Sequence, residues 1–293
     1  MEKKVIVITG PTATGKSALA TELSKLIGGE IVSADSMQIY KHMDIGTAKP
    51  SPKELEDVRH HLIDIIHPSD EYSVSKYVHD AVLCIDDIFS RGKTPVITGG
   101  TGLYIDSLLS GRDFSARNNN GLREELEAEY ETKGGEFLLS KLSEFDTQSA
   151  ETLHPNDKKR IVRAIEVYKT SGKTISTHNI ETRQLPPRYE AVKIALTYSD
   201  RAMLYDKIND RVDKMIDAGF EKEVRMLQKM NIPKNSTAMQ AIGYKEMLKA
   251  IDGEISMSEA IEQIKQESRR YAKRQLTWLR RDKTVQWLVR EGI

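Results

Sequence analysis

The sequence contains one cysteine, few aromatic residues, no excess of either charge and no long apolar run. The single cysteine, Cys84, excludes a disulfide framework and a cysteine-rich zinc module. An aromatic content of 6% argues against an aromatic-rich all-β fold. The 44 Lys and Arg residues balance 44 Asp and Glu residues, which rules out a uniformly basic nucleic-acid-binding protein but not a locally basic one.

The apolar segments are too short to suggest a membrane or secreted protein. No stretch reaches the ~18 apolar residues that a membrane span requires. The run at 5–8 is too short for a signal peptide, and a polar loop follows it at once. We therefore expect a cytoplasmic protein without a membrane segment. Its 293 residues, 39% of them hydrophobic, suffice for two domains or for one domain with a large insertion.

The first 110 residues alternate between short apolar strands and amphipathic helices. Residues 5–9 are β-branched without polar alternation, which is typical of a central parallel strand buried on both faces. Shorter strands are expected at 31–33, 62–66 and 95–98, and helices at 18–27 and 74–89. This order predicts an α/β fold, a parallel sheet flanked by helices.

The middle of the chain has a different pattern, without a convincing strand. Helices are expected at 121–132, 137–145 and 157–171, and Pro186-Pro187 ends this region. Residues 192–196 then return to the sheet, and helices follow at 200–218, 221–230, 238–250 and 256–281. We predict a catalytic core formed by 1–111 and 190–293, with an all-helical insertion at 112–189.

The zero net charge conceals two basic segments. Residues 157–173 hold six basic and two acidic residues, and residues 265–290 hold nine basic and two acidic residues. Residues 121–151, in contrast, hold nine acidic and three basic residues. One basic segment alone would be read as a solvated helix face. Two such segments beside an α/β core favour a polyanionic ligand.

The strongest motif matches G-x-x-x-x-G-K-[ST] and lies between a predicted strand and a predicted helix, which is the context of a P-loop. Its backbone N–H groups and the following helix dipole would bind a diphosphate or a longer chain of phosphates. Lys16 adds a positive charge, and the Ser17 hydroxyl can bind Mg²⁺. The motif consists of Gly10, Pro11, Thr12, Ala13, Thr14, Gly15, Lys16 and Ser17.

Two further segments should converge on the P-loop, because ligands bind at the carboxyl ends of parallel strands. Asp35 follows the second strand and could act as a general base, hold Mg²⁺ through water or merely stabilise a turn. The segment 99–102, Gly-Gly-Thr-Gly, follows another strand. Its glycines permit close approach of the backbone, and Thr101 can donate a hydrogen bond. A tight strand-to-helix turn would explain this segment equally well.

These motifs, together with several longer strings, resemble the bacterial tRNA dimethylallyltransferase family. The resemblance extends in order over nearly the whole chain, and the string at 35–50 is the most specific part. A C-terminal cysteine/histidine zinc finger, which eukaryotic relatives carry, is absent from the sequence. The similar segments are 10–17, 35–50, 61–64, 99–104, 156–164, 219–224, 240–246 and 271–280.

The resemblance implies transfer of a dimethylallyl group from dimethylallyl diphosphate to N6 of adenosine 37, beside the tRNA anticodon. It assigns the general base to Asp35 and the orientation of the reacting groups to Thr101. Arg211 would be a second clamp on the diphosphate, alongside the P-loop and Mg²⁺. The target adenosine would have to be flipped out of the stacked anticodon loop.

The resemblance also implies where the tRNA binds. The helical insertion would grip the anticodon stem-loop. Independently of the resemblance, we expect a monomer. The residues placed against the tRNA are Asp35, Ser36, Met37, Gln38, Thr101, Arg123, Lys159, Arg160, Ile161, Val162 and Arg163.

Three other functions remain open from the residues themselves. A P-loop small-molecule kinase or nucleotidase would use the basic segments as lids or solvated faces. An adenylate isopentenyltransferase would use the same donor with a free nucleotide as acceptor. A non-catalytic RNA-binding protein would retain the P-loop without turnover. The large insertion and the basic last helix favour a macromolecular acceptor.

Overall fold

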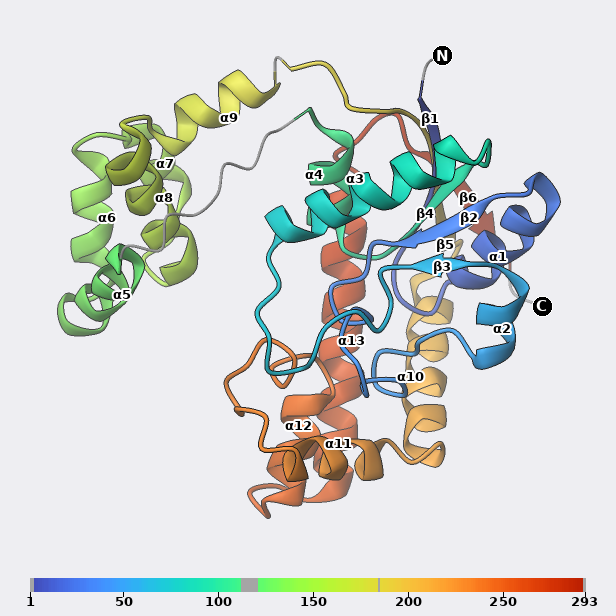
Figure 1. The fold of residues 1–293 in the computed structure, drawn as a ribbon. Helices are drawn as coiled ribbons and strands as arrows, with labels where there is room; N and C mark the ends of the chain where they lie inside the picture. Colours follow the sequence, from blue (N-terminus) through green and yellow to red (C-terminus); the bar gives the residue numbers. More distant parts are fainter. Residues whose placement is uncertain (1–2, 112–120, 184, 292–293) are drawn as a thin grey trace. The chain divides into compact units, whose positions relative to one another are not determined.

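The computed structural model describes residues 3–111, 121–183 and 185–291, and the chain divides into two compact units (Figure 1). The first unit comprises 1–109 and 188–293, and the second comprises 110–187. The insertion predicted at 112–189 is thus displaced by two residues at each end, and residue 112 lies outside the described residues. None of the described helices is long and apolar enough to cross a membrane.

The first unit is built on a parallel six-stranded sheet with the order β3-β2-β4-β1-β5-β6. Ile8 in the central strand pairs with Thr98 on one side and with Ile194 on the other. Val5, Val7 and Ile8 are buried, as the β-branched run predicted. The strands are β1 (Lys4–Thr9), β2 (Glu30–Ser33), β3 (His60–His61), β4 (Pro95–Gly99), β5 (Glu190–Tyr198) and β6 (Gln286–Arg290).

Helices cover both faces of this sheet. The chain passes from β1 through β2 to β3 in one direction and then returns to β4. Right-handed crossovers therefore place α1 (Lys16–Ile27) and α3 (Val74–Ser90) on opposite faces, as Figure 1 shows. The short helix α2 (Pro52–Asp57) contacts α1, and α4 (Gly102–Leu109) contacts α3.

Four helices near the end of the chain form a further layer of the first unit. They are α10 (Arg201–Asp217), α11 (Phe220–Lys229), α12 (Tyr244–Ile251) and α13 (Met257–Leu279). Each of them contributes buried side chains to one hydrophobic cluster with Ile39, Tyr40 and Met43, which lie in the segment after β2. This layer therefore holds a loop that starts at the carboxyl end of the sheet.

The secondary structure of the second unit consists of helices, without a strand, in its described residues. Leu138, Leu142, Ile161 and Ile165 lie at the centre of its own hydrophobic cluster. Asp146 begins the third helix by accepting from Ser149 N, and it also accepts from Ser176 N in the last helix. The helices are α5 (Leu122–Lys133), α6 (Gly135–Ser143), α7 (Thr147–Thr152), α8 (Lys158–Ser171) and α9 (Ile175–Arg183).

The structure corrects several predicted elements. The strand expected at 62–66 is wrong, because Leu62 and Asp64 have φ values of 63° and 56°, which break an extended chain. Only Ile66 makes a bridge there, to Tyr40, and the true strand is β3. The helix expected at 238–250 begins only at Tyr244. The sequence pattern did not predict α2, α7, α9 or β6.

Candidate active site

The loop between β1 and α1 has the backbone of an anion-binding site. Gly10 and Gly15 have φ values of 143° and 82°, which glycine adopts more readily than other residues. A Cβ atom at Gly10 would lie 2.6 Å from the backbone oxygen of Leu196 in β5. Gly15 is the N-cap of α1 and has no side chain to occupy the first N–H groups of that helix. These groups can therefore bind a phosphate.

Contacts from distant elements fix this loop. The Thr14 hydroxyl donates to the Pro11 carbonyl at 2.9 Å inside the loop. Arg290, in β6, donates to the Thr14 carbonyl at 3.0 Å, and the Tyr198 hydroxyl donates to the Ala13 carbonyl at 3.3 Å. Neither Arg290 nor Tyr198 was predicted, because no local pattern links them to the loop. The ends of β5 and β6 thus stabilise the P-loop from outside.

Lys16, at the start of α1, and Arg211, on α10, face the same space. Burial, and then the positive charge of Arg211, lower the pKa of Lys16 to about 8, although the negative charge of Asp35 acts in the opposite direction. Burial also lowers the pKa of Arg211, and Asp35 again opposes the shift. Two partly desolvated cations that repel each other favour an anion between them.

Asp35 lies in the segment after β2, and Thr101 lies in the segment after β4. A hydrogen bond between Thr101 and Ser36, the neighbour of Asp35, joins the two segments. The Oδ1 atom of Asp35 accepts from the backbone N–H groups of Met37 at 2.9 Å and Gln38 at 3.3 Å. The Thr101 hydroxyl accepts from Ser36 N at 3.1 Å. The two backbone bonds orient the Asp35 carboxylate and leave Oδ2 as the atom that can take a proton.

One cavity of about 370 Å³ joins the P-loop, Asp35 and the helical layer. Of the residues predicted for the site, those that line it are Thr12, Lys16, Ser17, Asp35, Ser36, Met37, Gln38 and Arg211. Thr101 does not line the cavity, but its hydroxyl accepts a hydrogen bond from the backbone N–H of Ser36, which does. Gly10, Pro11, Ala13, Thr14 and Gly15 shape the loop without lining the cavity in this structure.

The sequence analysis assigned no role to the residues in the remaining wall of this cavity. Its apolar part comes from the helical layer and includes Ile208, Val212, Met215, Phe220, Ile242 and Ile264. Its polar part includes Thr98, Tyr271, Arg274 and Gln275. Burial, and then the negative charge of Asp35, raise the pKa of Tyr271 to about 12. Tyr271 therefore stays a neutral phenol at physiological pH.

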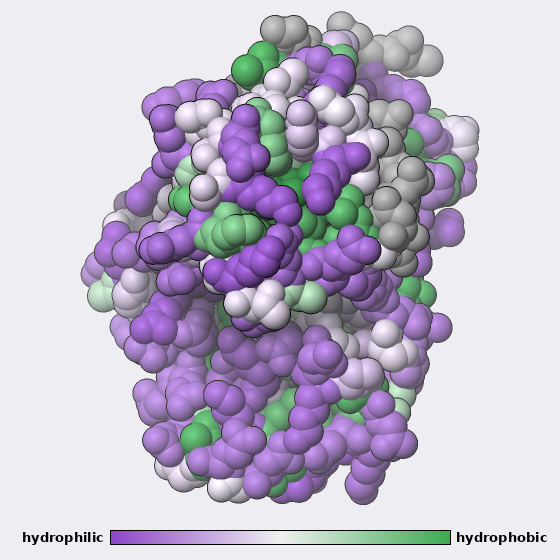
Figure 2. All heavy atoms as spheres, turned by 90° about the vertical axis from the view of Figure 1, so that its left-hand side faces the viewer, coloured by the Kyte–Doolittle hydropathy of each residue, from purple (hydrophilic) through white to green (hydrophobic). Residues whose placement is uncertain are grey.

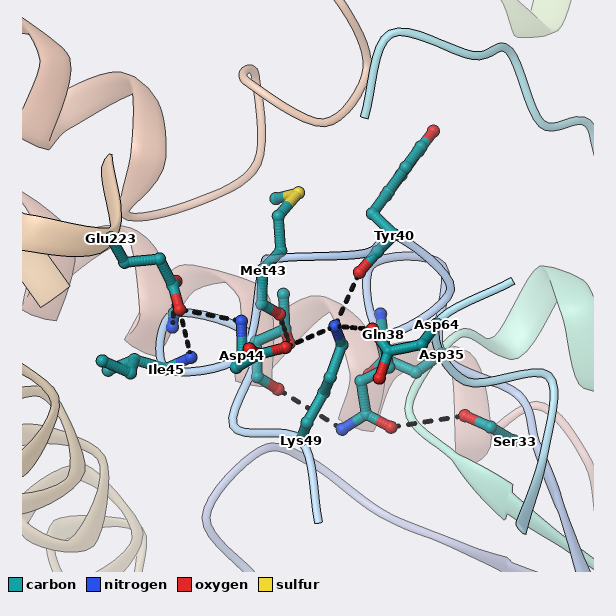
Figure 3. A network of polar contacts seen from close by, with 12 residues as sticks. Ser33, Asp35, Gln38, Tyr40, Met43, Asp44, Ile45, Lys49, Asp64 and Glu223 are labelled. Carbon is teal, nitrogen blue, oxygen red and sulfur yellow. Dashed lines mark hydrogen bonds and ion pairs between the residues drawn. The ribbon is translucent and has the colours of Figure 1, made fainter. Parts of the chain in front are cut away.

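A buried carboxylate holds the loop that forms one side of the cavity (Figure 3). Glu223, on α11, accepts from the backbone N–H groups of Asp44 at 2.8 Å, Ile45 at 2.7 Å and Gly46 at 3.1 Å. It also accepts from the Tyr244 hydroxyl at 2.6 Å. Its side chain therefore fixes the backbone just before the lining residues Thr47 and Ala48.

Two polar side chains close this loop from the other end (Figure 3). The Gln38 amide donates to the carbonyls of Thr47 at 3.3 Å and Ala48 at 3.2 Å. Lys49 donates to the Tyr40 carbonyl at 2.6 Å and to the carboxylates of Asp44 and Asp64. Gln38, predicted to contact tRNA, thus also ties the segment after Asp35 to the cavity wall.

The second unit carries the other predicted RNA contacts, and several are ion-paired within their own helix. Arg123 pairs with Glu127 at 3.1 Å, and Arg163 pairs with Glu166 at 2.8 Å. Arg160 is 75% exposed at the side chain and lies 4.0 Å from Asp157, and Lys159 is exposed. Hydrophilic side chains also dominate the surface that Figure 2 shows.

Ile161 and Val162 do not fit the predicted role. Both side chains are fully buried, in the cluster that also holds Leu138 and Leu142. The prediction that these side chains contact RNA is therefore wrong, because the inner face of α8 forms the core of the second unit. Only the outer face of this helix presents its charges.

The described residues contain no group of three or more His, Cys, Asp or Glu side chains suited to a metal ion. The Ser17 hydroxyl and the Asp35 carboxylate nevertheless line the same cavity as Lys16. One hydroxyl and one carboxylate suit Mg²⁺ that arrives with a diphosphate and keeps most of its water, rather than an ion in an all-protein cage.

The fold and the site together define a P-loop α/β protein whose phosphate site opens into a partly apolar cavity. The family model described as IPP transferase matches residues 38–282, and the chain belongs to this family.

Curated relatives agree over nearly the full length. The tRNA dimethylallyltransferase of Acetivibrio thermocellus is 50% identical, over 98% of this chain and 92% of its own. The tRNA dimethylallyltransferase of Bacillus subtilis is 46% identical, over 98% of this chain and 90% of its own. These relatives confirm the resemblance to the bacterial family.

Solved structures agree as well. A tRNA isopentenylpyrophosphate transferase from Bacillus halodurans is 40% identical, with a TM-score of 0.74 over 100% of this chain and 91% of its own. A eukaryotic dimethylallyltransferase acting on tRNA is 30% identical, with a TM-score of 0.85 over 98% and 74%. The predicted α/β fold with a parallel sheet flanked by helices is thereby confirmed.

Proposed function

We propose that this protein transfers a dimethylallyl group from dimethylallyl diphosphate to N6 of adenosine 37 in tRNA and releases pyrophosphate. The observation that carries the proposal is the cavity itself. Lys16 and Arg211 share it with an oriented carboxylate, Asp35, and with the apolar side chains of Val212, Met215 and Phe220. Such a combination fits the diphosphate ester of a short hydrocarbon better than it fits a nucleotide alone.

The chemistry requires stabilisation of a leaving group that gains negative charge as the allylic C–O bond breaks. The P-loop N–H groups, Lys16 and Arg211 supply this stabilisation. Mg²⁺, held at the Ser17 hydroxyl, would neutralise further charge on the pyrophosphate. Because both cations are partly desolvated, their interaction with the departing charge is stronger than it would be in water.

The acceptor is an aromatic amine whose lone pair is delocalised, so it needs positioning and a base. As the C–N bond forms, the amine loses a proton, and Oδ2 of Asp35 is the atom that takes it. Met37 N and Gln38 N fix the other oxygen of the carboxylate. Thr101, which accepts from Ser36 N, positions the segment that carries Asp35.

The adenosine must leave the anticodon stack before it can enter this cavity, at a cost of about a few kcal/mol. The exposed charges of the second unit support tRNA binding, since the Lys159 and Arg160 side chains are exposed and can reach phosphates. That the enzyme works as a monomer in the cytoplasm stays a prediction of the sequence.

The test is incubation of the protein with labelled dimethylallyl diphosphate, Mg²⁺ and unmodified tRNA, with AMP as a parallel acceptor. We expect label in tRNA and none in AMP. Label in AMP alone would indicate an adenylate isopentenyltransferase. Release of ADP from ATP on addition of an acceptor would indicate a kinase. Binding of tRNA without label in either acceptor would leave only an RNA-binding protein.

A further inference from the structure

Gln275, on α13, joins two loops of the active site through the two ends of one side chain. Its Oε1 atom accepts from Thr12 N in the P-loop at 3.0 Å. Its Nε2 atom donates to the Gly100 carbonyl, after β4, at 2.9 Å. The residue is 7% exposed. The amide can therefore adopt only one orientation, because an acceptor must meet the N–H group and a donor must meet the carbonyl.

The connection continues from Gly100 to the catalytic carboxylate. The next residue, Thr101, donates its N–H to the Ala34 carbonyl at 3.2 Å and accepts from Ser36 N through its hydroxyl at 3.1 Å. Ala34 and Ser36 flank Asp35. A chain of hydrogen bonds and peptide bonds thus runs from the phosphate loop through Gln275 to the residue that would take the proton.

Close packing leaves this connection little freedom. A Cβ atom at Gly100 would collide with Nε2 of Gln275, and a Cβ atom at Gly99 would collide with the backbone of Ala34. Gly100 is not among the glycines with positive φ, so a side chain at this position would displace the Gln275 amide rather than strain the backbone. A shift of the P-loop at Thr12 must then be followed by Gln275 and by the Gly100–Thr101 segment.

We propose that Gln275 is a positioning residue that couples occupation of the P-loop to the placement of Thr101 and Asp35. Binding of the diphosphate would order the part of the cavity around Asp35 and Thr101, here called the acceptor side, before the adenosine enters. The assignment of an acceptor side rests on the proposed function. The coupling itself concerns only the response of two loops to an anion, and it can be measured without tRNA.

The first test uses inorganic pyrophosphate with Mg²⁺ as the probe and hydrogen exchange as the readout. In the unmodified protein, pyrophosphate should slow exchange both in the P-loop and in the peptide covering 99–105. Gln275→Met fills the same space without either hydrogen bond. In this variant the P-loop should still be protected, while protection of 99–105 should be lost. Gln266→Met, on an exposed part of the same helix, is the matched control and should behave like the unmodified protein.

The outcomes separate the two proposals. Failure of pyrophosphate to bind the unmodified protein would overturn both the donor site and the coupling. Binding without protection of 99–105, or full protection of 99–105 in Gln275→Met, would overturn the coupling alone. A thermal denaturation curve establishes that each variant is folded before it is compared.

The second test separates positioning from binding by kinetics. A misplacement of about 1 Å in an active site can reduce rates about 100-fold. We expect Gln275→Met to lower kcat about 10- to 100-fold while the Kd for pyrophosphate changes less than about 3-fold. Gly100→Ala, which displaces the amide from the other side, should lower kcat similarly. In the double variant the two losses should not multiply, because both remove one connection. Multiplying losses would contradict the proposal.

Discussion

The polar side chains that fix the cavity loops of the first unit make different contacts from the arginines predicted to bind tRNA in the second unit. In the first unit, Glu223, Gln275 and Arg290 bind backbone groups that are far away in the sequence, and each of them fixes a loop of the cavity. In the second unit, Arg123 and Arg163 pair with carboxylates three or four residues away on the same helix. In the first unit, the position of each loop depends on one particular side chain. The second depends mainly on the sum of exposed charge, because single surface ion pairs contribute little.

The largest effect on the reaction rate is expected from a substitution of Asp35. Asp35→Asn keeps the size and an acceptor oxygen but cannot take the amine proton. General-base catalysis is worth roughly 10²–10⁴-fold, so we expect a loss of this size in single-turnover rates with enzyme in excess. The affinities for pyrophosphate and tRNA should change only a few-fold. Recovery of the rate at high Mg²⁺ would instead make Asp35 chiefly a metal ligand, and a rate near wild type would make it a turn residue.

The next largest effect should appear in stability, at the carboxylate that holds the cavity loop. Glu223→Ala leaves three backbone N–H groups and the Tyr244 hydroxyl without their acceptor. We expect the free energy of unfolding to fall by about 2–4 kcal/mol in urea denaturation. Glu221→Ala is the matched control on the same helix. It removes only an exposed ion pair with Arg225 and should change stability by less than about 0.5 kcal/mol. Equal losses of stability in the two variants would show that the buried contacts of Glu223 matter no more than the exposed ion pair of Glu221.

A pH dependence sharpens the role of Lys16. Its pKa in the free protein is about 8, and a bound anion must raise this value because it favours the charged form. Above pH 8 binding therefore takes up a proton, and pyrophosphate affinity should fall by up to about 10-fold per pH unit as the pH rises. Isothermal titration over pH 7–10 measures this slope. Pyrophosphate also titrates in this range, so the Lys16→Arg variant, which keeps its charge, is the control. The difference between the affinity slopes of the unmodified protein and this variant is the contribution of Lys16. Identical slopes would show that the Lys16 ammonium does not bind the anion.

The smallest effect per residue is expected in the second unit. Replacing Arg160 and Arg163 with Gln should weaken tRNA binding modestly. It should also reduce the slope of log affinity against log salt concentration by about one to two units. Pyrophosphate binding should not change. An unaltered salt slope would make this helix a solvated face and would give the insertion another role.

The sequence predicted those parts of the molecule whose physical cause is local. The P-loop follows from glycine spacing between a strand and a helix, and β1 follows from an unbroken β-branched run. The strand β6 was missed because all five of its residues are exposed, so no alternation marks an inner face. Ile161 and Val162 were assigned to RNA as members of a string. Helical spacing from Ile161 to Ile165 would have placed the former on the inner face of α8.

The supporting contacts of the cavity could not be predicted in the same way. Gln275 meets Thr12 across 263 residues, and Glu223 meets Ile45 across 178 residues. Each is one polar residue among many on a charged helix, and only the packing of the helical layer onto the sheet selects it. The local pattern thus identified the P-loop and marked Asp35 and Thr101 as candidates, and the family resemblance added their roles and Arg211. The residues that position them required the three-dimensional structure.

The central claim is that one cavity holds both the diphosphate and the flipped adenosine. The most direct measurement is mass spectrometry of nuclease digests, after incubation of an unmodified tRNA with dimethylallyl diphosphate and Mg²⁺. The account predicts one added dimethylallyl group, on adenosine 37 alone, and its loss with Lys16→Ala although tRNA binding persists. Modification of another nucleotide, or undiminished modification by a folded Lys16→Ala protein, would contradict it.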